Sequence, residues 1–573
     1  MNTRHFSAFA LGLMLVAVPL ASPAQPHSPP TQATIPTPEP SPILPVTPTV
    51  APGFKAPDVR PTSAAIVGIT QQPFVGIKLM DAVTMALAKN PNLAISAANT
   101  RIAGYQIAAA KGAYDVRFNV VPSVTHSVTA PENAFFAGPN FGPITANTQS
   151  LNVGVSGQLP TGTQYQVGIT QQKFDNNTII NAFDPWYTST LNASITQPLL
   201  KNAGPGNETQ RQIQLAVINQ DATTAATLTS VSNTIGQVSD AYWDLVAAWR
   251  SVAIQEDALK QAVAQQNSNV RLAKHGAAAP IDAVESSTQV AVYQDNVFSA
   301  LQRVAQLQNQ LKSLIADNPG DPIWMANLMP TTSIESTPPA LSLNQLMSNA
   351  MKYRPELAQA AAQRRQAGVN LAYAKNQLLP QVDLQAQYQG NGFAGNALPP
   401  VGGAFGSATP PPYLGGTYSQ AYGNIGRFPS YTVGVNISAP LGNHTAKAQY
   451  AAAQEQERIA TITSSNVDER ILFDVRNALQ NFQTAESRLY AARRAREASQ
   501  AVYESELRRF RAGESTTFLV TQRQIELVQN QGRELQAQTD FDKAVVALRE
   551  ADGTIFAASN VNLSTLGEGA LKP

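Results

Sequence analysis

Apolar residues recur between residues 231 and 252 at spacings that alternate between four and three. The positions are Val231, Ile235, Val238, Tyr242, Leu245, Trp249 and Val252. This heptad spacing places the apolar side chains on one stripe of an α-helix, as in a coiled coil. A looser stripe of the same kind contains Ile525, Val528, Leu535, Phe541, Val545 and Leu548. The pattern predicts long helices that pack side by side.

Proline spacing sets the expected helix ends, because proline interrupts a helix interior. Two long helices are predicted at 206–275 and 443–512, and four shorter ones at 91–115, 280–317, 355–379 and 514–552. A long helix would span roughly 105 Å, and two shorter ones end to end roughly 95 Å. Each half of the chain is therefore expected to pair one long helix with two shorter ones stacked on each other.

Two of the shorter helices are expected to begin at a proline, Pro91 and Pro355, where the missing N–H costs nothing. Asn90 is a suitable cap before Pro91, whereas Arg354 is not a capping residue.

The segment "LAISAANTRIAGYQIAAAKGAYDVRFNV" from Leu93 also aligns without a gap with "LAQAAAQRRQAGVNLAYAKNQLLPQVDL" from Leu357. Later landmarks keep the same order in both halves. These matches predict an internal duplication.

Between the helices the apolar period changes to two, which predicts β-strands. Six stretches of about ten residues alternate in this way; they lie at 117–128, 150–159, 163–172, 190–198, 381–389 and 431–438. A soluble sandwich with one wet face has the same alternation. Uncharged Gln, Asn, Ser and Thr at the polar positions favour a membrane barrel instead. So do aromatic residues expected near strand ends, as in an interfacial girdle: Phe174, Phe183, Trp186, Tyr187, Tyr388 and Tyr431.

The N-terminus carries the features of an exported protein. Residues 1–24 combine a short basic start, an apolar run and small residues at a cleavage site, as in a signal peptide. The alternative, a membrane anchor, would need a longer apolar run. Residues 25–63 are rich in Pro and are expected to be a disordered tether. No other apolar run is long enough for a membrane helix, so an exported chain of this kind either is free or spans an outer membrane as strands.

Charge and cysteine content exclude several functions. The 39 Lys and Arg residues nearly balance 38 Asp and Glu residues, so no basic excess points to nucleic acid. The chain has no cysteine, which excludes disulfides, thiol catalysis and cysteine-bound metal. Its five histidines are far apart and lack the spacing of metal ligands. No catalytic motif occurs, and we expect neither an enzyme activity nor a cofactor or metal.

The duplicated plan and four motifs together resemble the TolC-like outer-membrane efflux protein family. The motifs are "ALAKNPNL", "SITQPLLKNAGPG", "SDAYWDLVAAW" and "KHGAAAPIDAVESS", and the resemblance covers nearly all of residues 76–556. It implies an α+β membrane protein in which three chains share an outer-membrane β-barrel that continues as a long periplasmic α-helical barrel. It also implies an export duct of a tripartite efflux or type I secretion system. Its partners would be a periplasmic adaptor, an inner-membrane transporter and outer-membrane lipid, with no nucleic acid.

On this basis the chain divides into two repeats, residues 76–318 with strands at about 117–198 and residues 341–556 with strands at about 380–440. A linker at 319–340 joins them, and a tail at 557–573 follows. Family members usually have two strands per repeat, but the first repeat here has four candidate segments. We expect an extra hairpin, which either widens the barrel to six strands per chain or folds outside the membrane.

The turns between paired helices are the candidate functional sites. Gly276 and Gly513 suit the left-handed turn that reverses the chain, and the resemblance implies that these turns dock an adaptor. Asp282 and Glu285 follow Gly276 on one helical face and would form acidic rings at the periplasmic aperture of a three-fold assembly. The alternative is a solvated helix N-terminus, where acidic residues are favourable.

A second class of function is a surface adhesin or structural coiled coil with a β-barrel anchor. Such a protein would need neither an acidic aperture nor an inner-membrane partner. A simple porin is disfavoured by helices of about 70 residues, because porins are built from strands and loops.

Overall fold

A computed structural model of the chain describes residues 74–130, 142–178, 181–332, 342–399 and 410–559. All of them belong to one compact unit, Thr62–Pro573. The predicted signal peptide and Pro-rich tether lie outside the described residues, as does most of the predicted tail. None of the helices in the described ranges is long and apolar enough to cross a membrane.

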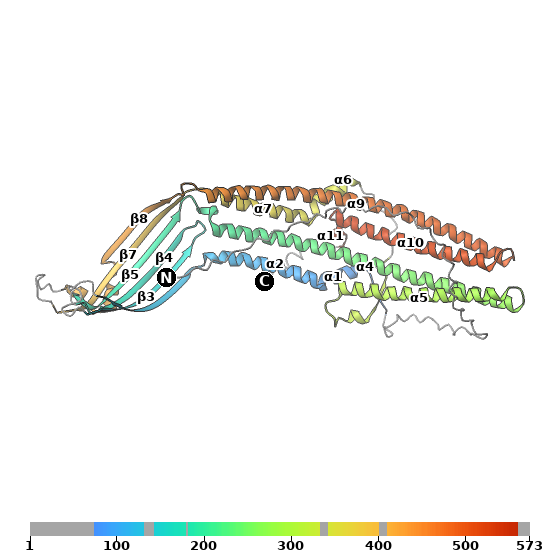
Figure 1. Cartoon of the computed structure of the whole chain (residues 1–573), viewed down its shortest axis with the longest axis horizontal. Coiled ribbons are helices and arrows are strands. Elements are labelled where there is room, and N and C mark those ends of the chain that lie inside the picture. Colours follow the sequence, from blue (N-terminus) through green and yellow to red (C-terminus); the bar gives the residue numbers. More distant parts are fainter. Residues whose placement is uncertain (1–73, 131–141, 179–180, 333–341, 400–409, 560–573) are drawn as a thin grey trace, which may run out of the picture. The chain divides into compact units, whose positions relative to one another are not determined.

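The helices begin and end close to the predicted residues (Figure 1). The two long ones are α4 (Glu208–Lys274) and α9 (His444–Arg511), each about 100 Å long. The shorter ones are α2 (Pro91–Lys111), α5 (Pro280–Ile315), α7 (Pro355–Asn376) and α10 (Thr517–Ala551). As expected, α2 and α5 pack along α4, and α7 and α10 pack along α9.

The predicted stripe on α4 is the core of the first half. Six of its seven residues are buried, and Tyr242 and Leu245 have no exposed surface. Trp249 is partly buried, and its indole Nε1–H donates to the carbonyl of Leu328 at 3.0 Å. The equivalent cluster in the second half includes Ile471 and Phe541. Burial of these apolar stripes is the main force that holds each helix pair together.

The looser stripe on α10 differs from the prediction. Phe541 and Leu548 are buried, but Ile525, Val528 and Leu535 are only partly buried. Polar residues share the buried positions, and the amide of Gln524 donates to the carbonyl of Ala258 at 3.1 Å. The reason is that α10 contacts both α9 and α4, so no single apolar stripe can meet both neighbours.

The strands form one antiparallel sheet in the order β2-β3-β4-β5-β7-β8. Their bounds are β2 (Arg117–Thr129), β3 (Ile144–Gln158), β4 (Gln164–Asn176), β5 (Phe183–Pro198), β7 (Gln381–Ala397) and β8 (Phe428–Ser438). The expected extra hairpin is therefore present, as β3 and β4. Gly162, with φ of +88°, lies in the tight turn that joins them. The strands end next to the helices at one end of the sheet (Figure 1).

The two faces of the sheet differ in chemistry. Residues opposite each other on paired strands share a face. One row crosses all six strands on what we call the apolar face: Phe118, Val155, Val167, Ala193, Tyr388 and Tyr431. The next row lies on the polar face: Asn119, Gly154, Gly168, Asn192, Gln389 and Ser430. The alternation in the sequence thus gives one apolar and one polar surface.

The aromatic residues are not arranged as a single girdle at the strand ends. Tyr388 and Tyr431 face each other within the strands, in the middle of the apolar face. Phe174 and Trp186 stack at 5.3 Å between ring centroids, but their row lies on the polar face. Tyr187 is on the apolar face, where the ring of Tyr418 packs against it. Most of the six residues lie near strand ends, as predicted, but they do not share one face. Position along a strand does not reveal which face a residue occupies until the register is known.

Several shorter elements were not expected. They are β1 (Phe74–Ile77), α1 (Leu79–Lys89), β6 (Asn327–Pro330), α6 (Leu343–Tyr353), α8 (Tyr418–Gly423) and α11 (Ile555–Ala558). Strand β6 lies in the predicted linker and pairs in parallel with β1. Leu328 of β6 is fully buried, so this part of the linker belongs to the core of the first half.

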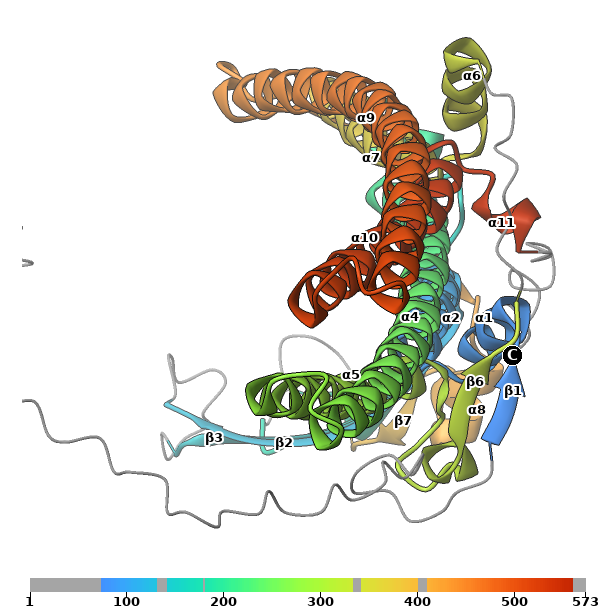
Figure 2. The same cartoon turned by 90° about the vertical axis from the view of Figure 1, so that its right-hand side faces the viewer.

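Seen toward the helix turns, the helices form one curved layer (Figure 2). Near the sheet the order is α2, α4, α7 and α9; near the turns it is α5, α4, α10 and α9. Among the described elements, α2 and α5 therefore lie at one edge of the layer and α9 at the other. Strands β2 and β8 are the corresponding edges of the sheet.

Candidate functional site

Two helix turns at the end opposite the sheet carry the predicted site residues (Figure 1). Gly276 and Gly513 have φ of +70° and +79°, the left-handed backbone expected for them. After each helix an N–H reaches back five residues, from Ala277 to Leu272 at 2.9 Å and from Glu514 to Arg509 at 2.9 Å. This is the Schellman arrangement, which satisfies the last carbonyls of a helix and needs a left-handed residue.

Asp282 and Glu285 lie one helical turn apart in the first turns of α5. The carboxylate of Asp282 accepts a hydrogen bond from the backbone N–H of Ala279 at 3.2 Å, so it helps to cap the helix. Glu285 is exposed and forms no such cap. Both acids lie near the start of α5, and a role in an aperture remains a prediction.

The second turn contains basic residues that the sequence reasoning did not single out. Arg508, Arg509 and Arg511 lie in the last turn of α9, where positive charge is favourable at the helix C-terminus. Glu506 lies 4.0 Å from Arg509 and accepts a hydrogen bond from the Ser515 hydroxyl. The signal is visible in the sequence as "RRFRAG" from Arg508, where three basic residues precede the glycine of the turn. The helix turns therefore present both signs of charge.

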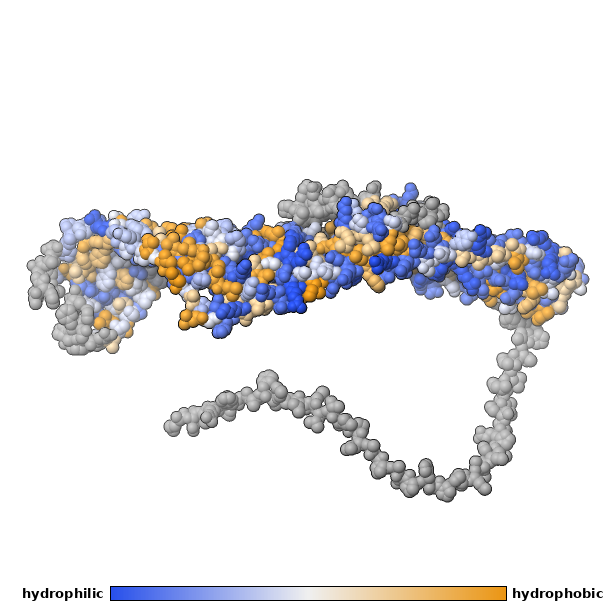
Figure 3. Space-filling model, turned by 90° about the horizontal axis from the view of Figure 1, so that it is seen from above, coloured by the Kyte–Doolittle hydropathy of each residue, from blue (hydrophilic) through white to orange (hydrophobic). Residues whose placement is uncertain are grey.

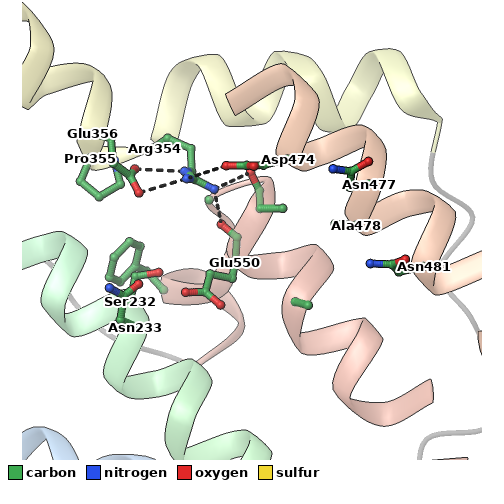
Figure 4. A pocket seen from close by; sticks show the side chains of 14 residues that line it. Ser232, Asn233, Arg354, Pro355, Glu356, Asp474, Asn477, Ala478, Asn481 and Glu550 are labelled. Carbon is green, nitrogen blue, oxygen red and sulfur yellow. Dashed lines mark hydrogen bonds and ion pairs between the residues drawn. The ribbon is translucent and has the colours of Figure 1, made fainter. Parts of the chain in front are cut away.

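A second polar cluster lies midway along the helices, where both halves meet (Figure 4). Arg354, just before α7, pairs with Glu356 at 3.0 Å and with Asp474 of α9 at 3.7 Å. Its guanidinium also donates to the carbonyls of Glu550 and Ala551 at the end of α10. A cavity of about 340 Å³ adjoins these side chains. Arg354 thus connects three helices of the second half.

The same position in the first half is Asn90, and it has a similar structural role. Its side chain accepts from the N–H of Asn92 at 2.9 Å, as predicted for a cap, and donates to the carbonyl of Leu314 at 3.1 Å. Leu314 is near the end of α5, the counterpart of α10. Both residues therefore satisfy a carbonyl at a helix end, where no intrahelical partner is available. Arg354 makes no cap to α7, also as predicted.

Carboxylates outnumber cations around this cluster. Asp244 pairs with Lys543 at 2.6 Å, and Asp240 lies near both. Burial raises the pKa of Asp240, an effect that Lys543 opposes and Asp244 reinforces. Burial also raises the pKa of Glu550, which Arg354 opposes. Deprotonation of Asp240 and of Glu550 therefore costs stability at neutral pH.

We expect Glu550→Gln to raise the apparent melting temperature at neutral pH. A carboxyl whose pKa is higher in the folded state binds its proton more tightly there, so its ionisation destabilises the fold. The difference from the unmodified chain should narrow as pH falls toward 4.5, the ordinary value for Glu. Thermal unfolding scans of the detergent-solubilised protein between neutral pH and pH 4.5 measure this difference in melting temperature. Glu455 forms an exposed i,i+3 pair, so Glu455→Gln should leave the apparent melting temperature and its pH dependence unchanged. The expectation would be contradicted if the melting temperature depended on pH in the same way in both variants.

Comparison with known proteins agrees with this architecture. The sequence model of a family described as outer membrane efflux protein matches residues 346–554. Comparison with curated proteins by sequence finds no match. The solved outer-membrane channel OprN has a TM-score of 0.60 and 16% identity, with 88% of this chain and 98% of that chain covered.

Two further structures are similar at comparable levels. The CmeC outer-membrane channel of Campylobacter jejuni has a TM-score of 0.59 and 13% identity, over 86% of this chain and 89% of that chain. The MtrE outer-membrane channel of Neisseria gonorrhoeae, in its open state, has a TM-score of 0.55 and 16% identity, over 83% of this chain and 88% of that chain. The family model thus matches most of the second half, and the fold of outer-membrane channels extends over most of the chain. The resemblance to the TolC-like outer-membrane efflux protein family is confirmed.

Proposed function

We propose that the chain is the channel subunit of a tripartite efflux or type I secretion system and serves as a passive export duct. The observation that supports this most directly is a pair of helices of about 100 Å joined to a sheet with one apolar and one polar face. The helices are long enough to extend through a periplasm while the sheet stays in the outer membrane. No catalytic activity is assigned.

The exposed apolar surface of the sheet supports a membrane location. Large apolar side chains are more than one-third exposed on all six strands, and all but Val121 and Phe428 lie on the apolar face. Monomeric soluble proteins rarely expose an apolar patch of this extent. Lipid would cover this face, and the polar face would line a water-filled lumen.

The edges of the subunit favour assembly into a ring, and we propose a homotrimer. Strands β2 and β8 each lack a partner on one side within the described sheet, and unpaired strand edges are costly in a membrane. The helices at the two edges expose apolar residues as well: Ile95, Ile102 and Tyr105 on α2, and Ile459, Ile462 and Phe473 on α9. Pairing one edge with the opposite edge of the next copy would bury both sets in a closed ring.

The helix turns would then lie at the periplasmic end of the channel. There, Gly276 and Gly513 would mark the turns that meet an adaptor protein, with an inner-membrane transporter beyond it. Loss of the turn geometry should therefore weaken adaptor binding more than membrane insertion. The exported substrate would be chosen mainly by that transporter.

We expect the double change Asp282→Asn with Glu285→Gln to lower cation selectivity of the channel severalfold. In a trimer these residues would form acidic rings, which raise the local concentration of cations. The amide oxygen of Asn can still accept from Ala279 N–H, so charge is removed while the cap remains. Reversal potentials in planar bilayers under a salt gradient measure the selectivity. An unchanged reversal potential would mean that both acids only stabilise the helix N-terminus.

The proposed function is tested by deleting the gene in its host. Loss of the channel should increase accumulation of dyes or drugs or abolish secretion of a protein, and the intact gene should restore export. A strain that exports normally but fails to adhere would favour the alternative, an anchored adhesin. Detergent-extracted protein should also migrate as a trimer after cross-linking.

A further inference from the structure

The β3–β4 hairpin, Ile144–Asn176, is fully integrated into the sheet. Strand β3 pairs with β2 over Ile144–Ser156, and β4 pairs with β5 over Gln164–Phe174. These pairings are similar in length to those between the other strands. The hairpin is therefore part of the sheet along most of the strand length, and it separates two strands that would otherwise be neighbours.

The hairpin also has the same two faces as the rest of the sheet. Its apolar-face residues are Leu151, Val153, Val155, Tyr165, Val167 and Ile169. Ile169 is paired with Leu191 of β5, and Val153 with Val120 of β2. The apolar face thus continues without interruption from strands outside the hairpin across the hairpin itself. Figure 3 shows apolar residues gathered on the part of the molecule where the strands meet the helices.

The position of the apolar zone shifts gradually across the sheet, and the hairpin follows this shift. On β2 the apolar positions run from Phe118 toward the end of the strand far from the helices, as far as Val128, and His126 interrupts them. On β8 they run from Tyr431 toward the helices, as far as Ile437. The zone on β3 and β4 is intermediate. A slanted zone of this kind is expected where tilted strands cross a membrane of constant thickness.

On β4 the apolar zone of the hairpin ends before Lys173. Lys173 of β4 lies on the apolar face and pairs with Asp175 at 3.7 Å, so water must reach this level. Its row continues to Tyr187 and then Ala394, which α8 covers with Ala421 and Tyr418. In this row β4 therefore carries a charge and α8 covers β5 and β7, whereas β2 still presents the exposed Val124, in agreement with the slant of the zone.

We infer that the β3–β4 hairpin is part of the membrane wall, so that a trimer has eighteen strands rather than the twelve that the family resemblance implies. Each chain contributes six strands. Barrel diameter grows roughly in proportion to strand number, so the cross-section would be about twice that of a twelve-stranded barrel with the same tilt. This inference rests on the proposed membrane channel.

The wider lumen would have an uncharged wall midway along its strands, whereas Arg117 and Asp383 lie on the polar face nearer the helices. Two adjoining polar-face rows contain no charged residue among the described strands, namely the row of Asn119 and the row of Val121, Asn152, Thr170, Thr190, Asn391 and Phe428. Uncharged amides and hydroxyls can hydrogen-bond a hydrated solute without selecting its sign. The middle of the membrane section therefore suits bulky hydrated cargo, and discrimination by charge would occur closer to the helices and at the helix turns.

Nitroxide labels on single cysteines test the inference in the assembled protein, because the chain has no cysteine of its own. The test pair is Ile169→Cys and Thr170→Cys on β4, and the reference pair is Leu191→Cys and Thr190→Cys, their partners on β5. In proteoliposomes, labels at Ile169 and Leu191 should be relaxed by oxygen, which concentrates in lipid. Labels at Thr170 and Thr190 should be relaxed by a water-soluble nickel complex.

The outcomes separate this inference from the proposed function. If Leu191 contacts lipid but Ile169 contacts water, the hairpin lies outside the membrane and the inference is wrong, while the channel proposal stands. If Leu191 also contacts water, the membrane channel itself is wrong.

A variant that lacks residues 142–178 provides a second measurement, since β2 and β5 would remain antiparallel neighbours. Added from the external side, polyethylene glycols should enter the intact channel at larger sizes than they enter this variant. Equal size limits would overturn the wider lumen. If the variant does not assemble, the nitroxide labels on the full chain decide the matter.

Discussion

Replacing Arg354 by alanine is expected to lower the free energy of unfolding of the helical part by about 3 kcal/mol. The guanidinium is 12% exposed and pairs with Glu356 and Asp474, and it also donates to two carbonyls at the end of α10. Removing it would leave Glu356, only 20% exposed, without its ion-pair partner. It would also raise the pKa of Glu550 further, because Arg354 is the cation that lowers it. Denaturant unfolding followed by far-ultraviolet circular dichroism measures the loss.

Two further variants serve as controls for Arg354→Ala. Arg365→Ala removes another arginine of α7 whose pair with Asp221 is shorter, at 2.8 Å, but whose partners are 51% and 49% exposed. Exposed pairs contribute less than about 1 kcal/mol, so this variant should be nearly neutral. Arg354→Lys keeps the positive charge but loses the planar guanidinium that donates several hydrogen bonds. Its loss of unfolding free energy should lie between those of Arg354→Ala and Arg365→Ala. Equal losses for Arg354→Ala and Arg365→Ala would show that burial does not distinguish these pairs.

The long helices could be predicted because their signal is local. Prolines mark the ends, and the stripe from Val231 to Val252 repeats over several turns of one helix. The turns at Gly276 and Gly513 were predictable for the same reason, because reversal of a helix requires a left-handed residue. Features of this kind do not depend on which distant part of the chain lies nearby.

The elements that were missed depend on distant contacts. Strand β1 is only four residues long and forms because it pairs with β6, about 250 positions away in sequence. Arg354 is unremarkable in sequence, since its partners on α9 and α10 are brought to it by the fold. The strands also extend beyond the predicted ten residues. Past Gln171 the apolar face carries Lys173 and Asp175, so the alternation ends although the strand continues.

The same reasoning explains why the hairpin was visible in sequence and its location was not. Alternation in residues 150–172 revealed two strands, but whether they cross a membrane depends on the level of their apolar zone relative to other strands. Only the strand register fixes the position of the apolar zone of the hairpin relative to the other strands. It aligns Val167 with Ala193 and Val155 with Phe118. A shift of one residue would have placed the apolar side chains on the lumen side.

Placing arginine at Val433 is expected to destabilise the assembled channel by about 2–4 kcal/mol, whereas arginine at the adjacent Thr432 should be tolerated. Val433 is 72% exposed and lies on the apolar face opposite Ala386, where lipid would surround a charged side chain. Thr432 lies opposite Gln387 on the polar face, where a charged group would remain in water. The two changes affect neighbouring residues of β8, so strand propensity and added volume are closely matched. The yield of heat-resistant trimer in outer membranes and the urea midpoint after refolding into liposomes measure the difference. Equal loss in both variants would mean that the two faces do not meet different solvents, and the assignment of lipid to one and water to the other would fail.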